Sequence, residues 1–298
     1  MSRHIEVFAD GFSYLDSPRW YDGRLWVSDF YTPAVLAVDT DGSIEHVAEV
    51  AAQPSGLGWL PDGRLLIVSM RDHRILRREP SGDLVTHADL APLDPSGHLN
   101  DMVVTPFGRA YVGEFGFDLM GGDPIRTTRI YCVEPDGEAS VVANDMLFPN
   151  GMVLLTDSTL LVAETFGDRI TAFDSGTDGS LYNRREWIRF GQPPATDDVG
   201  VHLRNANVAP DGMCADIDGS IWVADGAHNR VLHVYRSGDV LEEISTGELG
   251  VYACMLGGHD GRTLFMCAAP SFYEHERAHA REGLLLTTRV EVPHGALP

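Results

Sequence analysis

The chain has 298 residues, of which 44% are apolar, and its 22 basic and 44 acidic residues give a net charge of −22. So negative a balance repels phosphate backbones and anionic membrane surfaces, which argues against nucleic acid or a membrane as a partner. The apolar fraction is too high for a disordered acidic chain, and the length suffices for one large or two small domains. We therefore expect a soluble globular protein.

We find no targeting segment in the sequence and no cysteine pairs with the spacing of metal ligands. The first residues lack an apolar run of signal-peptide length, and no segment approaches the ~20 apolar residues of a membrane span, so we expect a cytoplasmic location. The four cysteines stand singly inside apolar runs, without the spacing of a zinc site or a disulfide framework. We expect buried thiols at Cys132, Cys214, Cys254 and Cys267.

Turn signals and short apolar runs dominate the chain. The pair Asp-Gly, which favours tight hairpins because both residues tolerate positive φ, occurs ten times. A polar turn followed by an apolar strand recurs in six copies: 22–29, 62–69, 107–114, 157–164, 218–225 and 260–267. A second apolar strand follows each copy, at 35–38, 75–77, 130–133, 170–173, 231–235 and 284–288. The one segment in which we expect a short helix is 271–281.

The spacing of the copies indicates the architecture. Their first strand residues lie 40, 45, 50, 61 and 43 positions apart, which is near the ~40–50-residue period of four-stranded propeller blades. We predict an all-β fold, a six-bladed β-propeller with four-stranded antiparallel blades, as a single domain over residues 1–298. The alternative is a two-domain β-sandwich.

The strand before each copy should line the central channel, and aligning the six starts places one residue of each blade at an equivalent position. These residues are Asp16, Ser55, Asn100, Asn150, Asp211 and Val251. Equivalent positions in a propeller form a ring, so two carboxylates and two carboxamides would face a common point, as a hard cation such as Ca²⁺ requires. The alternative is that these residues only hold turns before strands, as Asp and Asn commonly do.

A second set of acids occurs at the end of the following strand in the same four blades: Asp29, Glu114, Glu164 and Asp225. We predict that they emerge at the same mouth, where their mutual repulsion would raise their pKa values unless a cation or hydrogen-bond donors offset it. The alternative is that they spread into solvent. Two long loops, 116–128 and 191–209, should open on this mouth and could form a substrate lid, or be surface insertions.

Several motifs, taken together, resemble those of the SMP-30/gluconolactonase/LRE-like (regucalcin-like) family. They are Ser-Pro-Arg-Trp at 17–20, Leu-Asn-Asp-Met-Val-Val at 99–104, Phe-Pro-Asn-Gly-Met at 148–152, Ala-Pro-Asp-Gly-Met-Cys-Ala-Asp at 209–216 with Ile-Trp-Val-Ala at 221–224, and Leu-Gly-Gly-His-Asp-Gly-Arg-Thr-Leu-Phe at 256–265. The resemblance covers nearly the whole chain in order. It implies a six-bladed propeller with one divalent metal in its channel, and hydrolysis of sugar lactones, related esters or organophosphates.

The resemblance also implies roles for residues of the ring. Asp16, Asn150 and Asp211 stand where the family has its metal ligands, and Asn100 stands at a substrate-contacting or ligand position. Two departures are visible. Asp16 replaces the usual Glu and is one methylene shorter, and His98 replaces an Arg that sugar-lactonase members often carry. The loss of that bidentate, permanently charged group weakens the case for sugar-lactone specificity.

We therefore predict a divalent-metal-dependent lactone hydrolase, with Ca²⁺ favoured over Zn²⁺, Mg²⁺ or Mn²⁺. The cation would polarise the ring carbonyl while water attacks, with Asp211 as general base and Asn100 and His98 orienting the substrate. His98 could equally be a surface residue. The chain has no Gly-x-Ser-x-Gly elbow, Walker loop or dinucleotide fingerprint.

Two rival functions use the same ring. One is hydrolysis of organophosphates or aryl esters, because the same cation can polarise a P=O group. The other is a non-catalytic metal-binding propeller, because fold does not determine function. In each case we expect a small molecule or an ion as the ligand and a monomer or weak homo-oligomer.

Overall fold

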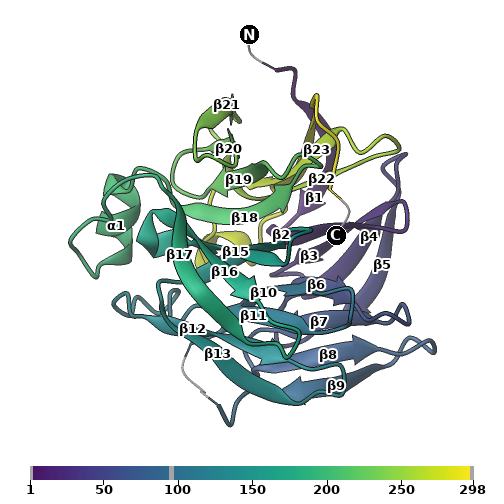
Figure 1. Ribbon diagram of the computed structural model, residues 1–298. Coiled ribbons are helices and arrows are strands. Elements are labelled where there is room, and N and C mark those ends of the chain that lie inside the picture. The colour runs from purple at the N-terminus through teal and green to yellow at the C-terminus, as the bar shows by residue number, and fades with distance from the viewer. Residues whose placement is uncertain (1–2, 94–96, 296–298) are drawn as a thin grey trace.

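The computed structural model describes residues 3–93 and 97–295, and in it six four-stranded antiparallel sheets form the blades of a propeller (Figure 1). Five blades each take four consecutive strands, running outward from the channel. They are β2 (Leu15–Tyr21), β3 (Arg24–Asp29), β4 (Ala34–Val38), β5 (Ile44–Glu49); β6 (Pro54–Trp59), β7 (Leu65–Ser69), β8 (Arg74–Arg78), β9 (Leu84–Asp89); β10 (Leu99–Val104), β11 (Ala110–Glu114), β12 (Thr128–Val133), β13 (Ala139–Met146); β14 (Pro149–Leu154), β15 (Thr159–Glu164), β16 (Arg169–Ser175), β17 (Leu181–Arg189); and β18 (Pro210–Ala215), β19 (Ile221–Asp225), β20 (Arg230–Val234), β21 (Val240–Ser245). The predicted fold class is confirmed, and the predicted strand pairs coincide with the second and third strands of the blades.

The sixth blade closes the ring with the two ends of the chain. It contains β22 (Gly250–Gly257), β23 (Thr263–Ala269) and β24 (Gly283–Arg289), and its outermost strand is β1 (Glu6–Phe12), which pairs antiparallel with β24. The sequence did not predict β1, because its mostly exposed residues lack an apolar pattern. Pairing the first strand with the last joins the two ends without a covalent link and covers a sheet edge.

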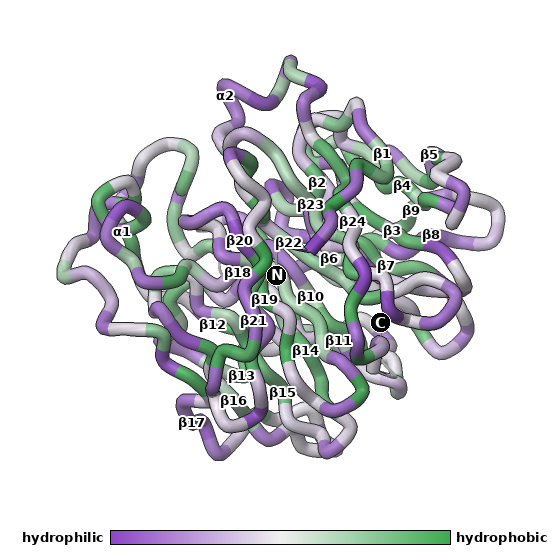
Figure 2. The backbone as a smooth tube through the Cα atoms, turned by 90° about the horizontal axis from the view of Figure 1, so that it is seen from above, coloured by the Kyte–Doolittle hydropathy of each residue, from purple (hydrophilic) through white to green (hydrophobic). Residues whose placement is uncertain are grey.

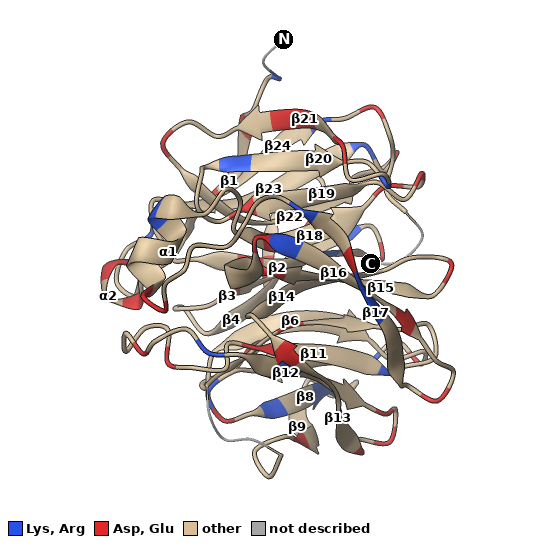
Figure 3. Ribbon diagram, turned by 60° about the vertical axis from the view of Figure 1, so that its left-hand side comes forward, with Lys and Arg blue, Asp and Glu red and all other residues tan. Residues whose placement is uncertain are grey.

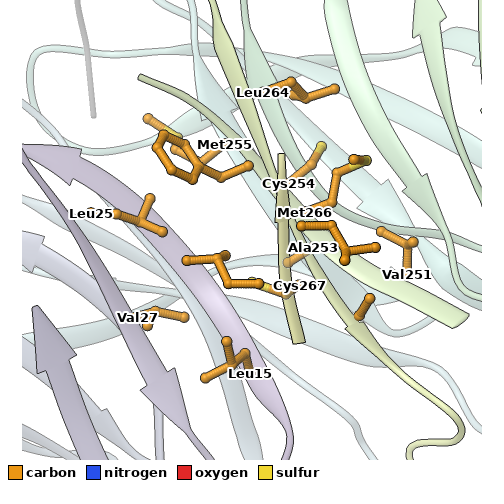
Figure 4. Close-up of a cluster of buried hydrophobic side chains, with 14 of the residues drawn as sticks. Leu15, Leu25, Val27, Val251, Ala253, Cys254, Met255, Leu264, Met266 and Cys267 are labelled. Atoms are coloured by element: carbon orange, nitrogen blue, oxygen red, sulfur yellow. The ribbon is translucent and has the colours of Figure 1, made fainter. Parts of the chain in front are cut away.

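The core lies between neighbouring blades and around the channel. The six innermost strands are almost entirely buried, whereas outermost strands such as β17 are polar and largely exposed, a contrast visible in the hydropathy colouring of Figure 2. Figure 4 shows how two blades meet: Leu15, Leu25 and Val27 of the first blade face Met255 and Cys267 of the sixth. All four cysteines are buried free thiols, as predicted.

The Asp-Gly pairs serve two different purposes. Asp22 and Gly23 both have positive φ, of 50° and 75°, in the two-residue turn that joins β2 to β3, as predicted. Asp211-Gly212 is no turn but lies inside β18. A Cβ on Gly212 would lie 2.4 Å from the Cβ of Ala253, so glycine is required there by the close approach of β22.

The helices lie outside the blades and are few. The predicted helix within 271–281 is confirmed as a single turn, α2 (Glu274–Arg277), and the 191–209 loop contains an unpredicted helix, α1 (Val199–Asn205). A 3₁₀ turn, η1 (Thr165–Gly167), follows β15. No helix in the described ranges is long and apolar enough to cross a membrane.

Candidate functional site

The six residues that the repeat alignment singles out occupy the same place in every blade, the second position of the innermost strand. In each blade the register of the pairing with the next strand shifts at this position or directly after it, as at a β-bulge. A bulge increases the local twist and re-aims a side chain. This repeated irregularity directs the side chains of the ring toward the channel.

Four of the six ring residues line one cavity at the mouth of the channel. Asp16, Asn100, Asn150 and Asp211 contribute to a space of about 570 Å³, including its open mouth. Ser55 lies beside them, with its hydroxyl oxygen 3.4 Å from the Oδ1 atom of Asn100. The structure thus brings together all four residues that the sequence predicts as metal ligands.

Hydrogen bonds between blades hold the two carboxamides in place. Asn100 Nδ2 donates to Asn150 Oδ1 at 3.0 Å, and Asn150 Nδ2 donates to Thr165 Oγ1 at 3.2 Å. The Thr165 hydroxyl in turn donates to the carbonyl of Pro210 at 2.9 Å, which ties the network to the strand that carries Asp211. Connected, satisfied networks of this kind fix side-chain orientation.

The two carboxylates of the ring are strongly perturbed. Asp16 and Asp211 are only 6% and 9% exposed. Burial raises the pKa of Asp16, and the nearby Asp101 charge adds to this. Burial followed by the charge of Asp16 raises the pKa of Asp211. The positive charge of Arg19 offsets little of the rise in the pKa of Asp16, because its guanidinium donates to Asp101 Oδ1 at 2.6 Å.

This donor set fits a hard divalent cation. Two carboxylates and two carboxamides supply oxygen ligands only, and a cation would offset the unfavourable negative charge that Asp16 and Asp211 place in a buried space. In residues 3–93 and 97–295, no three or more His, Cys, Asp or Glu side chains are grouped as a metal site. The oxygen atoms of the four ring residues suit Ca²⁺ or Mg²⁺ better than a metal that prefers thiolate or imidazole ligands.

The prediction that the strand-end acids converge at the mouth is wrong. Asp29, Glu114, Glu164 and Asp225 are at most 2% exposed and do not line the cavity. They pair with the residue that precedes the ring position: Leu15 with Asp29, Leu99 with Glu114, Pro149 with Glu164 and Pro210 with Asp225. Directly paired residues share a face of a sheet and successive residues alternate, so these acids point away from the ring.

Each strand-end acid is instead satisfied by local donors. Asp29 accepts from the backbone amides of Ser13 and Tyr14, and Asp225 accepts from Ala209 and Arg230. The other two acids have similar partners, as Arg169 and Thr171 on Glu164 show. These acids fasten the loops to the blades. In Figure 3 the remaining acids appear mainly on turns scattered around the molecule.

His98 lies beside the cavity but not in its lining. Its carbonyl accepts from the Phe115 amide at 2.8 Å, and its ring centroid is 6.1 Å from that of Phe115. Burial, followed by the nearby Arg71, lowers the pKa of His98, which favours a neutral imidazole. The proposed contact between His98 and substrate stays a prediction.

The aromatic walls of the cavity were not predicted from the sequence. Eight of its lining residues are aromatic: Tyr14, Phe30, Tyr31, Phe115, Phe148, Phe166, Tyr252 and Phe272. Several occupy repeated places, either two residues before the ring position, as in Tyr14 and Phe148, or directly after the strand-end acid, as in Phe30 and Phe115. Aligning the blades at those two places could have found them.

Loops complete the mouth. The 116–128 loop contributes Leu119 and Met120, and helix α1 contributes Leu203, so both predicted lid loops reach the cavity. Tyr31 Oη donates to the carbonyl of Phe272 at 2.8 Å, which joins the loop after β3 to the loop before α2. The mouth is thereby framed by segments from distant parts of the chain.

The fold and the site define a six-bladed β-propeller with a polar site of two carboxyl and two carboxamide side chains in its channel. A family model described as SMP-30/Gluconolactonase/LRE-like region matches residues 16–270. The chain belongs to this family, as the resemblance of its motifs predicts.

Relatives of known name include lactonases. The chain is 29% identical over 208 residues to a 6-deoxy-6-sulfogluconolactonase of Pseudomonas putida, a match that covers 67% of this chain and 64% of the relative. It is 26% identical to regucalcin of Danio rerio over 59% of this chain and 55% of the relative. It is 24% identical to the pentonolactonase XacC of Haloferax volcanii over 85% of this chain and 81% of the relative. The chain thus spans less than two thirds of the first two relatives.

Solved structures share the fold over the full chain. A calcium-binding protein, regucalcin, from Agrobacterium tumefaciens superposes with a TM-score of 0.79 at 18% identity, covering 100% of this chain and 97% of the other. A luciferin-regenerating enzyme gives a TM-score of 0.80 at 16% identity, covering 99% and 98%. At these identities the likeness supports the fold alone.

Proposed function

We propose that this protein is a divalent-metal-dependent lactone hydrolase. The observation that carries the proposal is the burial of Asp16 and Asp211 in one cavity with Asn100 and Asn150, in a chain whose relatives include enzymes named lactonases. These four residues would hold the cation, and their oxygen-only set favours Ca²⁺. When bound, the cation supplies a Lewis acid for the lactone carbonyl.

The side chains around the ring have separate tasks in this hydrolysis. Asp211 accepts a proton from the water whose oxygen forms the new bond to the carbonyl carbon. The acyl C–O bond of the lactone ring breaks, the released alkoxide takes the proton that Asp211 accepted, and the product is a hydroxy acid. Asn100 and Asn150, held by their hydrogen bonds, orient the substrate beside Asp211.

Tyr14 is placed to donate a hydrogen bond during this reaction. It lines the cavity, and its ring centroid lies 5.0 Å from that of Tyr252. Burial, followed by the charges of Asp211 and Asp16, raises the pKa of Tyr14 well above its usual value, so the hydroxyl keeps its proton. A protonated phenol can stabilise negative charge on the oxygen of an opening ester.

An Asp211→Asn variant tests the proposal. In a lactone panel assayed with added Ca²⁺, we expect kcat/KM to fall by at least about 100-fold, because a positioned general base contributes about 10²–10⁴ in rate. The exposed Asp218, in a turn between β18 and β19, gives the matched control Asp218→Asn, which should leave turnover unchanged.

Calcium affinity, measured by isothermal titration calorimetry, separates two causes of the loss. A variant that still binds Ca²⁺ but does not turn over has lost the base, whereas one that no longer binds has lost a ligand. Unchanged turnover in Asp211→Asn would refute the role of Asp211. Ca²⁺ binding by the wild type without hydrolysis of any lactone, ester or phosphotriester would replace the proposal with a metal-binding module.

A further inference from the structure

The cavity has two chemically different zones. Its polar side chains are Asp16, Asn100, Asn150, Asp211 and Thr165, together with the hydroxyls of three tyrosines. The remaining lining is aromatic or aliphatic carbon, apart from Gly226. The apolar zone includes the half-exposed side chains of Leu119, Met120 and Leu203 at the mouth. A ligand that reaches the ring must therefore lie with part of its surface against aromatic and aliphatic carbon.

No lysine or arginine is among the described residues that line this cavity. The nearby Arg71 donates to Gln53 at 2.7 Å and to Glu274 at 2.7 Å, so its guanidinium is already engaged. Among the described residues, the charged lining groups are Asp16 and Asp211, and a divalent cation would balance their two charges without leaving an excess for an anionic substituent. A lactone with a sulfonate, phosphate or carboxylate substituent would find no cationic partner among the lining residues.

The apolar walls offer few groups for the several hydroxyls of a sugar. The Tyr31 hydroxyl already donates to the Phe272 carbonyl, and the Thr165 hydroxyl already donates to the Pro210 carbonyl. The walls also contain the hydroxyls of Tyr14 and Tyr252, and that of Tyr14 is the one proposed to act on the lactone itself. Burying a hydroxyl against Phe115 or Phe148 without a partner is unfavourable, because its hydrogen bonds to water are lost. A polyhydroxylated substituent therefore fits these walls poorly.

One wall residue is held in a conformation that bulky residues rarely adopt. Phe148 has φ of 57°, in the left-handed region, although it is an aromatic residue. Its ring is packed between two others, 4.4 Å from Phe115 and 5.7 Å from Phe166 between centroids, and it lines the cavity two residues before Asn150. Strain of this kind persists where the surroundings over-determine it and is concentrated at functional sites.

We propose that the substrate is a lactone with an uncharged, apolar substituent, alkyl or aryl, which packs against these walls while the lactone ring lies at the carboxylates. This inference rests on the proposed lactone hydrolysis and specifies its substrate class. Each methylene that enters an apolar site improves affinity about fourfold. Two buried methylenes therefore give more than a tenfold preference.

Three δ-lactones with the same six-membered ring test the inference: δ-valerolactone, its pentyl derivative δ-decalactone, and glucono-1,5-lactone. With Ca²⁺ present and rates divided by spontaneous hydrolysis, we expect kcat/KM for δ-decalactone to exceed the other two at least tenfold. A preference for glucono-1,5-lactone would overturn the inference and leave the proposed function intact. If no lactone is hydrolysed, the proposed function is refuted. The preference of the cavity for an apolar substituent is then tested by the binding of lactams, which are analogues of the lactones.

Binding is measured by calorimetry with two lactams, piperidin-2-one and 6-pentylpiperidin-2-one, in Ca²⁺-loaded and in chelator-treated protein. We expect the pentyl lactam to bind at least tenfold more tightly in both forms, because the walls do not depend on the cation. Equal dissociation constants would overturn the inference whether or not hydrolysis is observed.

Leu203→Ser, on helix α1, removes part of the wall. We expect the ratio of pentyl-lactam to unsubstituted-lactam affinity to fall about fivefold or more. Val201→Ser, an exposed residue of the same helix outside the cavity lining, is the control and should keep the wild-type ratio. An unchanged ratio in Leu203→Ser would contradict the placement of the substituent against α1, and an increased ratio would refute an apolar wall.

Discussion

Replacing Glu164 with glutamine tests whether the strand-end acids hold the fold together without contributing to the channel site. Glu164 is fully buried, and its carboxylate accepts five hydrogen bonds. One oxygen accepts from Arg169 Nε at 2.8 Å, from Thr171 and from Arg184 at 3.5 Å. The other accepts from the Leu147 amide and the Arg169 terminal nitrogen, both at 2.9 Å. Glutamine has the same shape but only one acceptor oxygen, so its amide nitrogen must face donors.

The size of the effect follows from this geometry. Removing one partner of a buried ion pair costs about 3–5 kcal/mol, and because the Arg169 side chain is 21% exposed we expect about 3 kcal/mol, the lower end. With an unfolding entropy of about 2.1 cal/mol/K per residue, this corresponds to a Tm about 5 °C lower. Calcium affinity should not change, because Glu164 points away from the ring.

The pH dependence provides an independent check. Burial alone would raise the pKa of Glu164, but the hydrogen bonds from Arg169 and Thr171 outweigh it and hold that pKa below its usual range. The stabilisation is therefore complete above the pKa of the unfolded chain, about 4.3, and is lost as the pH falls through the lower folded-state pKa. The difference in unfolding free energy between wild type and Glu164→Gln should be constant near pH 7 and shrink below about pH 4.

Denaturant unfolding at several pH values and calcium calorimetry are the two assays. The control is Glu186→Gln on β17, where the ion pair with Arg189 is exposed and should contribute less than about 1 kcal/mol. Equal stability of Glu164→Gln and wild type at pH 7 would refute the structural role. A tenfold or greater loss of calcium affinity would refute the argument that the strand-end acids face away from the ring.

Two further predictions concern the ring itself. Ca²⁺ at 100 times its dissociation constant should stabilise the wild type by about 2.7 kcal/mol, which raises the Tm by about 4 °C. The Asp16→Asn variant should lose most of this increase in Tm. An undiminished increase would exclude Asp16 as a ligand. Tyr14→Phe should lower kcat on any hydrolysed lactone by about 100-fold with little change in KM, because the hydroxyl acts on the charge that develops during the reaction. A kcat equal to that of the wild type would exclude this role of Tyr14.

The sequence predicted the blades because each one repeats the same local signals. An apolar run bounded by turn residues, as in 62–69, specifies a buried strand whatever its neighbours are. The closure of the propeller by β1 has no such local signal, because β1 is an outermost strand with few buried residues. Its place is determined by pairing with β24, as in Glu6 with Thr287, and a partner so distant in sequence is invisible to local patterns.

The same distinction explains which parts of the site were predictable. Asp16 and Asp211 could be aligned because they share a repeat position, and their direction follows from a bulge that all blades share. For Asp29 and Asp225 the repeat position alone was misleading, because which face of the sheet a side chain occupies depends on register. Register shifts at bulges appear only once the strands are paired.

The division between strands and loops at this site also suggests how specificity can change within the family. The oxygen ring comes from innermost strands, whose burial and pairing tolerate little change, as the close packing of Gly212 against Ala253 illustrates. Much of the apolar wall comes from loops, including the segment that carries Leu119 and helix α1 with Leu203. Loops accept substitution and insertion more readily than the strands they connect. Substrate preference can therefore diverge through the loops while the residues proposed to hold the cation stay in place.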